Sequence, residues 1–328
     1  MIFAPAKINL GLRITGRYAN GYHHLESLFI PLTLYDRITV RLAARDEVVH
    51  HWPANTPPQA RRELGLGTAK NPLLIGALAL VRDFLREQTG DELPPLLVTL
   101  TKRIPSPSGL GGASADAAAL IRLLFDHHLI EQPPETFWPA VTRIGADVPF
   151  FLRYGLRGKS ALLQGIGHEL SGCTAPLLAG VVAIPPFGFS TQLMFAYVRK
   201  LELPRMEAKP MTGGIDFTLR LNEIPCSDEL AVGVRHVIND FDTAAEAVFP
   251  IQFALLQQAK RTMAFAASQM LAREWFVGMT GSGAGLFALT ANTVTADALR
   301  WMANVLRARL SGWQVFPVRS HTVSDIGP

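Results

Sequence analysis

The sequence is poor in cysteine and contains no long apolar run. Its 328 residues include two cysteines, Cys173 and Cys226, which form no CxxC pair and indicate no disulfide framework. The apolar run at 73–81 is far shorter than the ~20 residues that a membrane-spanning helix needs. The first residues also lack the basic and apolar regions of a signal peptide. We therefore expect a soluble, cytoplasmic protein that does not bind a membrane.

Clusters of basic residues are also absent. The 31 lysines and arginines exceed the 27 acidic residues by a small margin, and they are scattered along the chain. A dedicated nucleic-acid surface is therefore not expected, and RNA binding is the weakest alternative. Adjacent histidines at 23–24, 50–51 and 127–128 would point in different directions on a strand or helix, so we expect no metal cluster. An anionic small-molecule substrate fits this charge balance.

Three common nucleotide-binding signatures are missing as well. No glycine-rich segment ends in the Lys-Ser/Thr pair of a P-loop. No GxGxxG motif on a strand is followed by the ribose-binding acid of a Rossmann fold. The catalytic-loop and DFG motifs of protein kinases do not occur either. These absences argue against the three corresponding protein classes.

The most informative stretch is the glycine-rich segment 104–120. It follows a strand-like run at 96–101 and leads into a predicted helix at 114–125. The N-terminus of that helix would direct unsatisfied N–H groups and its positive dipole end at the loop, as in phosphate-binding sites. A tight turn capped by Ser114 explains the glycines alone equally well. The glycines that allow the chain to turn and a ligand to approach are Gly109, Gly111 and Gly112.

Two charged residues lie outside this loop in informative places. Residues 4–15 alternate as a half-buried strand that carries Lys7 and Asn9 on one face. Asp147 precedes an apolar run at 148–152, predicted as a strand, where a carboxylate would be poorly solvated and would need a cationic partner. An ordinary surface lysine and a helix-end aspartate remain open alternatives. Phosphoryl transfer requires a phosphate cradle, a cation and a carboxylate that orients or deprotonates a hydroxyl.

Strands and helices are interspersed without regular βαβα alternation, which favours an α+β fold. A shift toward glycine and serine at 157–172 predicts a boundary between an N-terminal ATP-binding domain (1–158) and a C-terminal domain (159–328). Other predicted elements are strands at 28–34, 37–42, 179–184 and 314–318, helices at 72–87, 136–144, 190–200, 240–271 and 295–310, a turn at 19–24, a strand–glycine loop–strand unit at 275–289, and loops at 53–59 and 203–214.

Three segments together resemble the superfamily of galactokinase, homoserine kinase, mevalonate kinase and phosphomevalonate kinase: 5–10, 105–119 and 280–284. Within it, segments 6–10, 21–23 and 145–149 are similar to the family of 4-diphosphocytidyl-2-C-methyl-D-erythritol kinases of the non-mevalonate isoprenoid pathway. The resemblance spans nearly the whole chain. It implies a two-domain α+β fold with the active site in the inter-domain cleft. It also implies ATP-dependent phosphorylation of the 2-hydroxyl of that family's small-molecule substrate, with Mg²⁺ as the companion of ATP.

The resemblance further implies a catalytic pair and a nucleotide site. Asp147 would accept the hydroxyl proton, while Lys7 would keep the carboxylate ionised and stabilise the transferring charge. Asn9 would lie beside them. No residue is assigned to a metal. The ATP site would comprise Asn71, Lys102, Pro105, Ser106, Pro107, Ser108, Gly109, Leu110, Gly111, Gly112, Ala113, Ser114 and Ala115.

The same resemblance implies a pocket for the cytosine of the substrate. Tyr22 would stack on the base, and His23 would form a hydrogen bond with its edge. Phe195 would be the other aromatic wall. Since these residues distinguish this family from other kinases of the superfamily, CDP should bind far better than UDP. Poor discrimination would favour another small-molecule kinase of the superfamily.

The glycine loop departs from the family pattern at Pro107, Ser108, Ala113 and Ala115, where the family usually has glycine or serine. Proline has no N–H, so one potential phosphate donor is lost, and Ala113 disfavours a positive φ. We therefore expect ATP binding to be weakened or reshaped rather than lost. A non-catalytic nucleotide-binding relative is the other alternative, although the retained catalytic pair argues against it. We expect a monomer or a weak homodimer.

Overall fold

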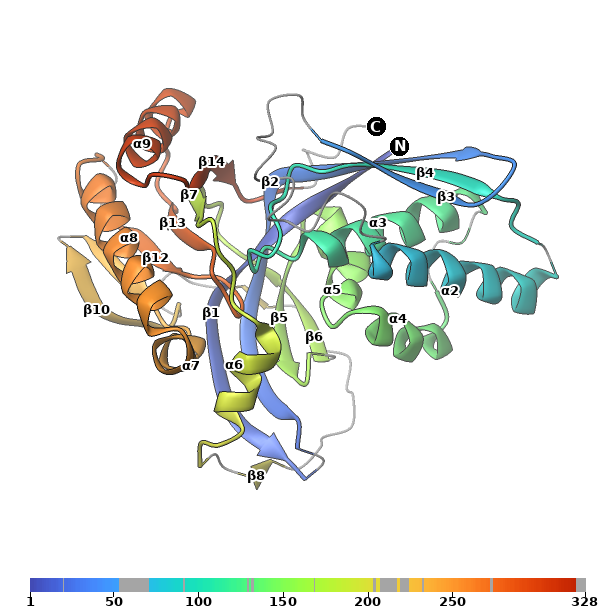
Figure 1. Ribbon diagram of the computed structural model, residues 1–328, viewed down its shortest axis with the longest axis horizontal. Helices are drawn as coiled ribbons and strands as arrows, with labels where there is room; N and C mark the ends of the chain where they lie inside the picture. The colour runs from blue at the N-terminus through green and yellow to red at the C-terminus, as the bar shows by residue number, and fades with distance from the viewer. Residues whose placement is uncertain are drawn as a thin grey trace.

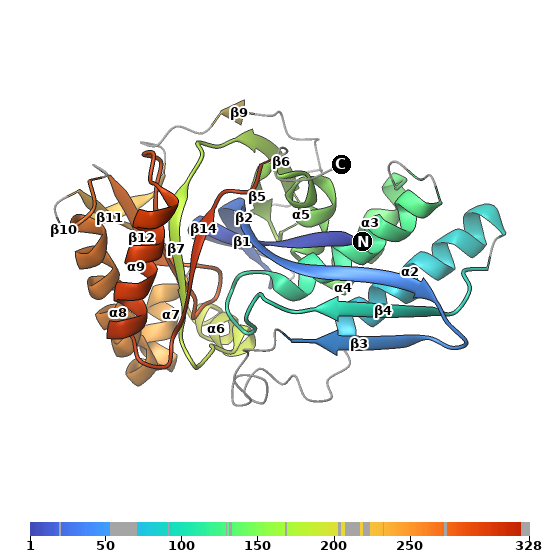
Figure 2. The same ribbon diagram turned by 90° about the horizontal axis from the view of Figure 1, so that it is seen from above.

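The structure is a computed structural model. It describes residues 1–19, 21–52, 71–90, 92–128, 130, 133–167, 169–202, 205–206, 217–218, 224–231, 233–271 and 274–322. The loop expected at 53–59 and most of the linker expected at 203–214 lie outside these residues. Two β-sheets lie at the centre, with helices α2 to α5 beside the first and helices α7 to α9 beside the second (Figures 1 and 2). The predicted α+β class is confirmed.

The first sheet is organised by a long antiparallel hairpin of β1 (Ile2–Tyr18) and β2 (His23–Leu42). These strands replace the shorter ones predicted at 4–15, 28–34 and 37–42. Gly21 has φ 86° in the turn between them, a value that suits glycine. The sheet order is β3-β4-β2-β5-β6-β9, and β1 also pairs with β8. The other strands are β3 (Glu47–His51), β4 (Leu96–Thr101), β5 (Ser160–Gly165), β6 (Glu169–Thr174), β8 (Arg205–Met206) and β9 (Phe217–Thr218).

Helices cover one side of this sheet. They are α2 (Pro72–Thr89), α3 (Gly112–His127), α4 (Trp138–Ile144) and α5 (Val148–Arg153), with short 3₁₀ turns at Glu135–Phe137 and Gly155–Arg157. Asn71 caps α2, as predicted, because its side chain accepts a hydrogen bond from the Leu74 N–H. The strand predicted at 148–152 is wrong, since this run forms α5. Pro149 fits the first turn of a helix, and a short apolar run cannot by itself distinguish a strand from a buried helix.

The second sheet has the order β10-β11-β12-β13-β7-β14. Its strands are β7 (Ala179–Ile184), β10 (Cys226–Ala231), β11 (Val234–Val237), β12 (Trp275–Met279), β13 (Leu286–Thr290) and β14 (Gln314–Arg319). Helices α7 (Phe241–Val248), α8 (Pro250–Ser268) and α9 (Ala296–Arg309) pack against it. Helix α6 (Thr191–Val198) lies near the turn end of the β1–β2 hairpin (Figure 1), where the Phe195 ring stacks on His23. The strands and helices predicted for this half are therefore present, with the tract 240–271 divided into α7 and α8.

A third apolar core lies between the two sheets. It joins residues of β1 and β2, such as Ile8 and Ile30, with residues of the second sheet, such as Phe276 and Phe287. Backbone hydrogen bonds add to it, since Leu12 N–H donates to the Ile238 carbonyl at 3.0 Å. The first sheet includes β5 and β6, so it extends past the boundary predicted at 158. The division of the chain into domains 1–158 and 159–328 stays a prediction.

The strand β1 is buried on both faces over residues 4–12, so the half-buried strand predicted there is wrong. Its polar face does not meet solvent because the glycine loop lies on it, where the Lys7 N–H donates to the Leu110 carbonyl at 2.9 Å. The alternation of apolar and polar residues shows which face of a strand each side chain occupies, but it does not show whether another part of the chain covers that face. Across the part of the chain that the structure describes, no helix has the length and apolar character to span a membrane.

Candidate active site

A cavity of 380 Å³ lies where the two halves of the molecule meet. The first half lines it with β1, the glycine loop and the N-terminal end of α5. The second half lines it with α6, the start of α7 and the loop between β12 and β13. Of the residues predicted for the site, the structure brings together at this cavity Lys7, Asn9, Pro105, Ser106, Pro107, Ser108, Gly109, Gly111, Gly112, Ala113, Ser114, Asp147 and Phe195.

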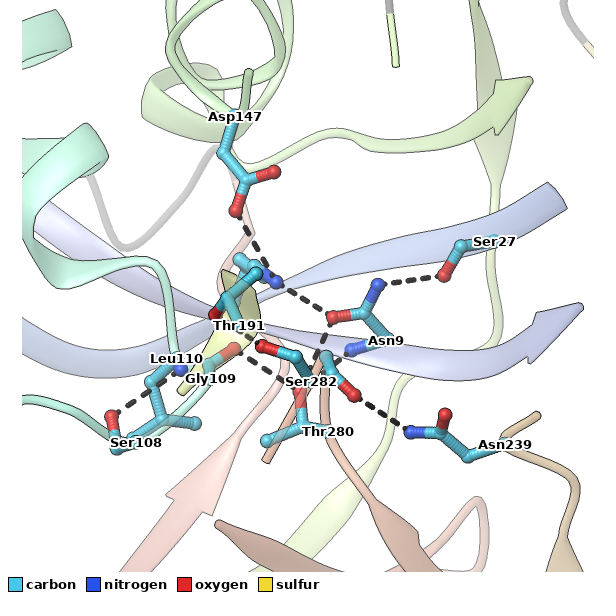
Figure 3. Close-up of polar contacts among 12 residues, drawn as sticks. Asn9, Ser27, Ser108, Gly109, Leu110, Asp147, Thr191, Asn239, Thr280 and Ser282 are labelled. Carbon is cyan, nitrogen blue, oxygen red and sulfur yellow. Dashed lines mark hydrogen bonds and ion pairs between the residues drawn. The ribbon is translucent and has the colours of Figure 1, made fainter. Parts of the chain in front are cut away.

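Lys7, Asn9 and Asp147 form the polar centre of the cavity (Figure 3). The Lys7 ammonium lies 2.6 Å from Asn9 Oδ1 and 3.4 Å from Asp147 Oδ2, and 4.6 Å from the centre of the Phe29 ring. The Lys7 side chain is 4% exposed, whereas that of Asp147 is 27% exposed. The expectation of a poorly solvated Asp147 is therefore wrong. Its carboxylate combines a cationic partner with access to the cavity, as a proton acceptor requires.

Two hydroxyl groups hold Asn9 beside the ammonium. Its Nδ2 donates to Ser27 Oγ at 2.7 Å, and Ser27 donates onward to the Gly11 carbonyl. Thr280 Oγ1 accepts the Asn9 backbone N–H at 3.0 Å and lies 3.3 Å from the Gly109 carbonyl. Neither hydroxyl is among the residues predicted for the site. Thr280 begins the third segment of the resemblance, but Ser27 has no signal beyond its place on a strand opposite β1.

The glycine loop is fixed by close contacts with both halves. Gly109 has φ 74°, and a Cβ atom there would lie 2.2 Å from the Thr280 carbonyl oxygen. Gly111 has φ 72°, and its Cβ would lie 3.0 Å from Lys7 Cε. Glycine is therefore required at both positions by backbone conformation and by packing, apart from any ligand. Ser108 adds a bond within the loop, from its Oγ to the Pro105 carbonyl at 2.6 Å.

The helix α3 begins at Gly112 with no side-chain cap, so the alternative of a turn capped by Ser114 is wrong. Residues 112–114, in its first turn, line the cavity instead. The N–H groups of a first helical turn have no partner within the helix, and they make this end of the cavity suitable for an anion. Ala113 has helical backbone geometry, so the expected cost of a positive φ does not arise. Leu110 and Ala115 are fully buried beside the cavity.

An aromatic wall occupies the other end of the site. The His23 ring stacks on Phe195 with a centroid distance of 5.5 Å, and Phe195 meets the edge of Phe241 at 4.9 Å. His23 is 6% exposed, and its Nε2 has no hydrogen-bond partner among the described residues. Burial, followed by Arg17 and Arg199, lowers the pKa of His23. This ring is therefore neutral near pH 7. Its Nε2 is buried, and His23 stands behind Phe195 rather than lining the cavity itself.

Tyr22, by contrast, is 61% exposed at the hairpin turn next to His23. It does not line the cavity. A ligand that enters from this side would meet the exposed ring first. The structure thus brings His23 and Phe195 together and leaves Tyr22 exposed, outside the cavity lining.

Lys102 is 5% exposed and lies between two buried carboxylates. Its ammonium forms ion pairs with Asp36 and with Asp116, the latter at 2.9 Å. Burial opposes the charge, but Asp116 and Asp36 raise the pKa of Lys102 above its usual value. Burial also raises the pKa of Asp116 well above its usual range. Neither Lys102 nor Asn71 lines the cavity.

Comparison with known proteins places these features in context. Residues 73–155 match the family model described as the GHMP kinases N terminal domain. The 4-diphosphocytidyl-2-C-methyl-D-erythritol kinase of Sphingopyxis alaskensis is 31% identical over 311 residues, which cover 94% of this chain and 94% of the relative. The kinase of the same name from Agrobacterium fabrum is 30% identical over 326 residues, covering 97% of this chain and 95% of the relative.

Solved structures show the same relationship. A crystal structure of a 4-(cytidine 5'-diphospho)-2C-methyl-D-erythritol kinase superposes with a TM-score of 0.62 at 25% identity, covering 97% of this chain and 98% of the other. A crystal structure of mevalonate kinase superposes with a TM-score of 0.55 at 10% identity, covering 98% of this chain and 99% of the other. The second likeness concerns the fold alone.

Proposed function

The chain belongs to the family of 4-diphosphocytidyl-2-C-methyl-D-erythritol kinases, and we propose that its cavity transfers the γ-phosphoryl group of ATP to the 2-hydroxyl of that family's substrate. The observation that carries this proposal is the contact of 3.4 Å between Lys7 Nζ and Asp147 Oδ2 within a cavity bordered by the glycine loop. A non-catalytic nucleotide-binding protein has no need of a cation and a base held together in this way.

In the proposed reaction, Asp147 takes the proton of the acceptor hydroxyl as the oxygen attacks the γ-phosphorus atom. The bond from this phosphorus atom to the bridging oxygen of the β-phosphate breaks, and ADP leaves. Lys7 pairs with this carboxylate, since its ammonium lies 3.4 Å from Asp147 Oδ2. Its ammonium also faces the cavity, where it can stabilise the charge on the transferring group. Asn9 accepts from Lys7 at 2.6 Å and so fixes the direction of the ammonium.

The phosphates of ATP would lie against the first turn of α3, whose residues 112–114 line the cavity. The hydroxyl of Ser114 offers an oxygen ligand there. One such protein ligand would suit Mg²⁺ that enters with ATP, because most ligands of Mg²⁺ would then be phosphate oxygens and water. The described residues contain no group of three or more His, Cys, Asp or Glu placed to hold a metal. When bound, Mg²⁺ would neutralise charge on the phosphates. We assign the reaction to the cytoplasm, where ATP is available.

The acceptor would place its cytosine at the aromatic end of the cavity. His23 supplies a neutral, unpartnered Nε2 for the edge of the base, and Phe195 supplies a ring that is already stacked on His23. The exposed Tyr22 would close over the other face of the base. With the cytosine at the aromatic end, the methylerythritol end of the acceptor would lie at the other end of the cavity, near Lys7 and Asp147.

The test is a mass-spectrometric assay of the purified protein with ATP, Mg²⁺ and 4-diphosphocytidyl-2-C-methyl-D-erythritol. A product heavier by one phosphoryl group, formed only with ATP, is the expected result. ATP binding without this product would instead favour another small-molecule kinase of the superfamily. Absence of both product and ATP binding would contradict the proposal altogether.

Tyr22→Ala should weaken acceptor binding by about 5- to 150-fold, which corresponds to the ~1–3 kcal/mol that stacking on one base contributes. The KM for ATP should remain close to that of the wild type, because Tyr22 lies at the acceptor end. Titration calorimetry with CDP measures the effect without turnover. Trp301→Ala, which removes a 48% exposed aromatic ring of α9 that does not line the cavity, is the matched control. A change confined to the KM for ATP would contradict the assignment of Tyr22 to the acceptor.

The low pKa of His23 predicts how acceptor binding depends on pH. Because burial disfavours the protonated ring, His23 stays neutral from pH 8 down past its usual pKa of about 6.5. The KM for the acceptor should therefore stay flat over that range. Below the lowered pKa it should rise by up to about tenfold per pH unit as the ring gains a proton. His23→Gln should abolish this rise, and a KM that already climbs between pH 7.5 and 6.5 would contradict the prediction.

A further inference from the structure

Asn239 lies between β11 and α7, and its side chain is used entirely inside the protein. Its Nδ2 donates two hydrogen bonds of 2.9 Å, to the Met279 and Gly281 carbonyls. Figure 3 shows Asn239 beside Thr280 and Ser282, with one of these bonds drawn. Its Oδ1 accepts the Phe241 N–H at 3.0 Å. The residue is 5% exposed and does not line the cavity, so it is no ligand for a substrate. Both donors and the acceptor of the amide are therefore committed to other parts of the chain.

The two carbonyls that Asn239 holds lie on either side of Thr280. The Thr280 hydroxyl in turn accepts the Asn9 N–H at 3.0 Å, and Asn9 accepts from Lys7 at 2.6 Å. A displacement of the loop between β12 and β13 would therefore move Thr280 and, through its hydrogen bond, Asn9 and the Lys7 ammonium. Since Gly109 packs against the Thr280 carbonyl, the glycine loop would be displaced as well.

The third bond of the amide reaches the aromatic wall. Phe241 lines the cavity and meets the edge of Phe195 at 4.9 Å, and Phe195 stacks on His23. The bond from the Phe241 N–H to Asn239 fixes the start of α7, from which this ring projects. The neighbouring Asp240 ties the same corner to β1, because its Oδ2 accepts the Ile14 N–H at 2.6 Å.

We propose that Asn239 is a positioning residue. It fixes the position of the aromatic wall of the acceptor pocket relative to the Lys7–Asp147 pair. One side chain holds both ends of the site, and only an amide of this length offers two donors and an acceptor at these points. The inference rests on the proposed function, because it assigns the Phe195 end of the cavity to the acceptor. Its role is indirect, through Thr280 and Phe241.

Asn239→Asp tests this role, because it keeps the shape and the acceptor but replaces both donors by a carboxylate oxygen facing two carbonyls. We expect kcat/KM for the acceptor to fall by about 10- to 100-fold, the scale of misplacement effects at a reacting centre. The KM for the acceptor should rise several-fold more than the KM for ATP. The matched control is Asn292→Asp, the same substitution at an exposed residue after β13, which should keep wild-type kinetics.

The pH profile separates positioning from a general loss of stability. The carboxyl introduced by Asn239→Asp is buried against carbonyl oxygens, so it should gain a proton at a higher pH than an ordinary aspartate. Once protonated it regains one donor. The ratio of the variant's kcat to that of the wild type should therefore rise by at least threefold between pH 8 and pH 6. A constant ratio would show that the bond to the loop has no part in catalysis.

The outcomes separate this inference from the function on which it depends. A wild-type protein that forms no phosphorylated product overturns the proposed function and the inference with it. A productive wild type together with an Asn239→Asp variant of unchanged kcat and KM overturns the inference alone. If Asn239→Asp does not fold, Asn239→Ala removes the two donors and the acceptor without adding a charge, and the same fall in kcat/KM is expected. Folding of each variant is checked by circular dichroism.

Discussion

Asp147→Asn is expected to lower kcat by about 10²- to 10⁴-fold, the contribution that a positioned general base usually makes. The amide keeps the size of the side chain but cannot accept the hydroxyl proton. ATP binding should change little, because the first turn of α3 and the glycine loop remain intact. Single-turnover kinetics with the methylerythritol substrate measure the chemical step, and titration calorimetry measures ATP affinity.

The matched control for this prediction is Asp126→Asn. Asp126 is an exposed aspartate on α3 that pairs with Arg122 one helical turn away and lies outside the cavity. It should retain the kinetics of the wild type. If Asp147→Asn turned over at the wild-type rate, the carboxylate would not be the base, and the reaction would have to proceed by electrostatic positioning through Lys7 alone.

Lys102→Met is expected to lower the free energy of unfolding by about 3–5 kcal/mol, the usual cost of removing one partner from a buried ion pair. The substitution would leave Asp36 and Asp116 facing each other without a cation in a fully buried place. Asp36 also accepts the N–H groups of Arg103 and Ile104, at the entry to the glycine loop. Urea denaturation monitored by circular dichroism measures the effect.

Asp116→Asn provides the control for the buried cluster. It removes one negative charge while keeping the Lys102–Asp36 pair, so it should cost only about 1 kcal/mol near pH 7. Because burial raises the pKa of Asp116 in the folded state, the contribution of this one group to stability should fall as the pH rises above the unfolded value near 3.8. Asp116→Asn should therefore gain stability relative to the wild type as the pH rises.

The prediction for Lys102→Met also decides between two roles for this lysine. The family resemblance implies a nucleotide contact, whereas the structure gives Lys102 two buried carboxylates as partners. A variant of wild-type stability that had lost ATP affinity would favour the nucleotide role and would contradict the structural one. A destabilised variant whose folded fraction binds ATP normally would do the opposite.

Local sequence patterns predicted most elements of this fold. The cap at Asn71 and the apolar periodicity after it indicated α2, and continuous apolar runs indicated β7 and β14. The predictions that were wrong concern segments whose structure depends on contacts with distant parts of the chain. The run after Asp147 is too short for its periodicity to be informative, and its proline suits a helix start. The burial of both faces of β1 depends on the glycine loop, which lies about 100 residues further along the chain.

The candidate site was predictable where its residues share one strand or one loop. Alternation alone put Lys7 and Asn9 on the same face, and their side chains do meet. It could not predict that Thr280 would bind the Asn9 N–H across 271 residues, nor that its carbonyl would exclude a side chain at position 109. Such contacts depend on how the two sheets pack. A glycine pattern therefore indicated the loop, but only packing explained Gly109.

The contact between Asn9 and Thr280 also has a consequence for how the protein is made. The strand that carries Lys7 and Asn9 is synthesised before every other described element, yet the hydroxyl that fixes Asn9 follows 271 residues later. A growing chain on the ribosome thus carries the ammonium, the loop and the carboxylate without the group that aligns them. Contacts between such distant residues form late and slow folding. The site can therefore be complete only after the chain has been made and folded as far as Thr280.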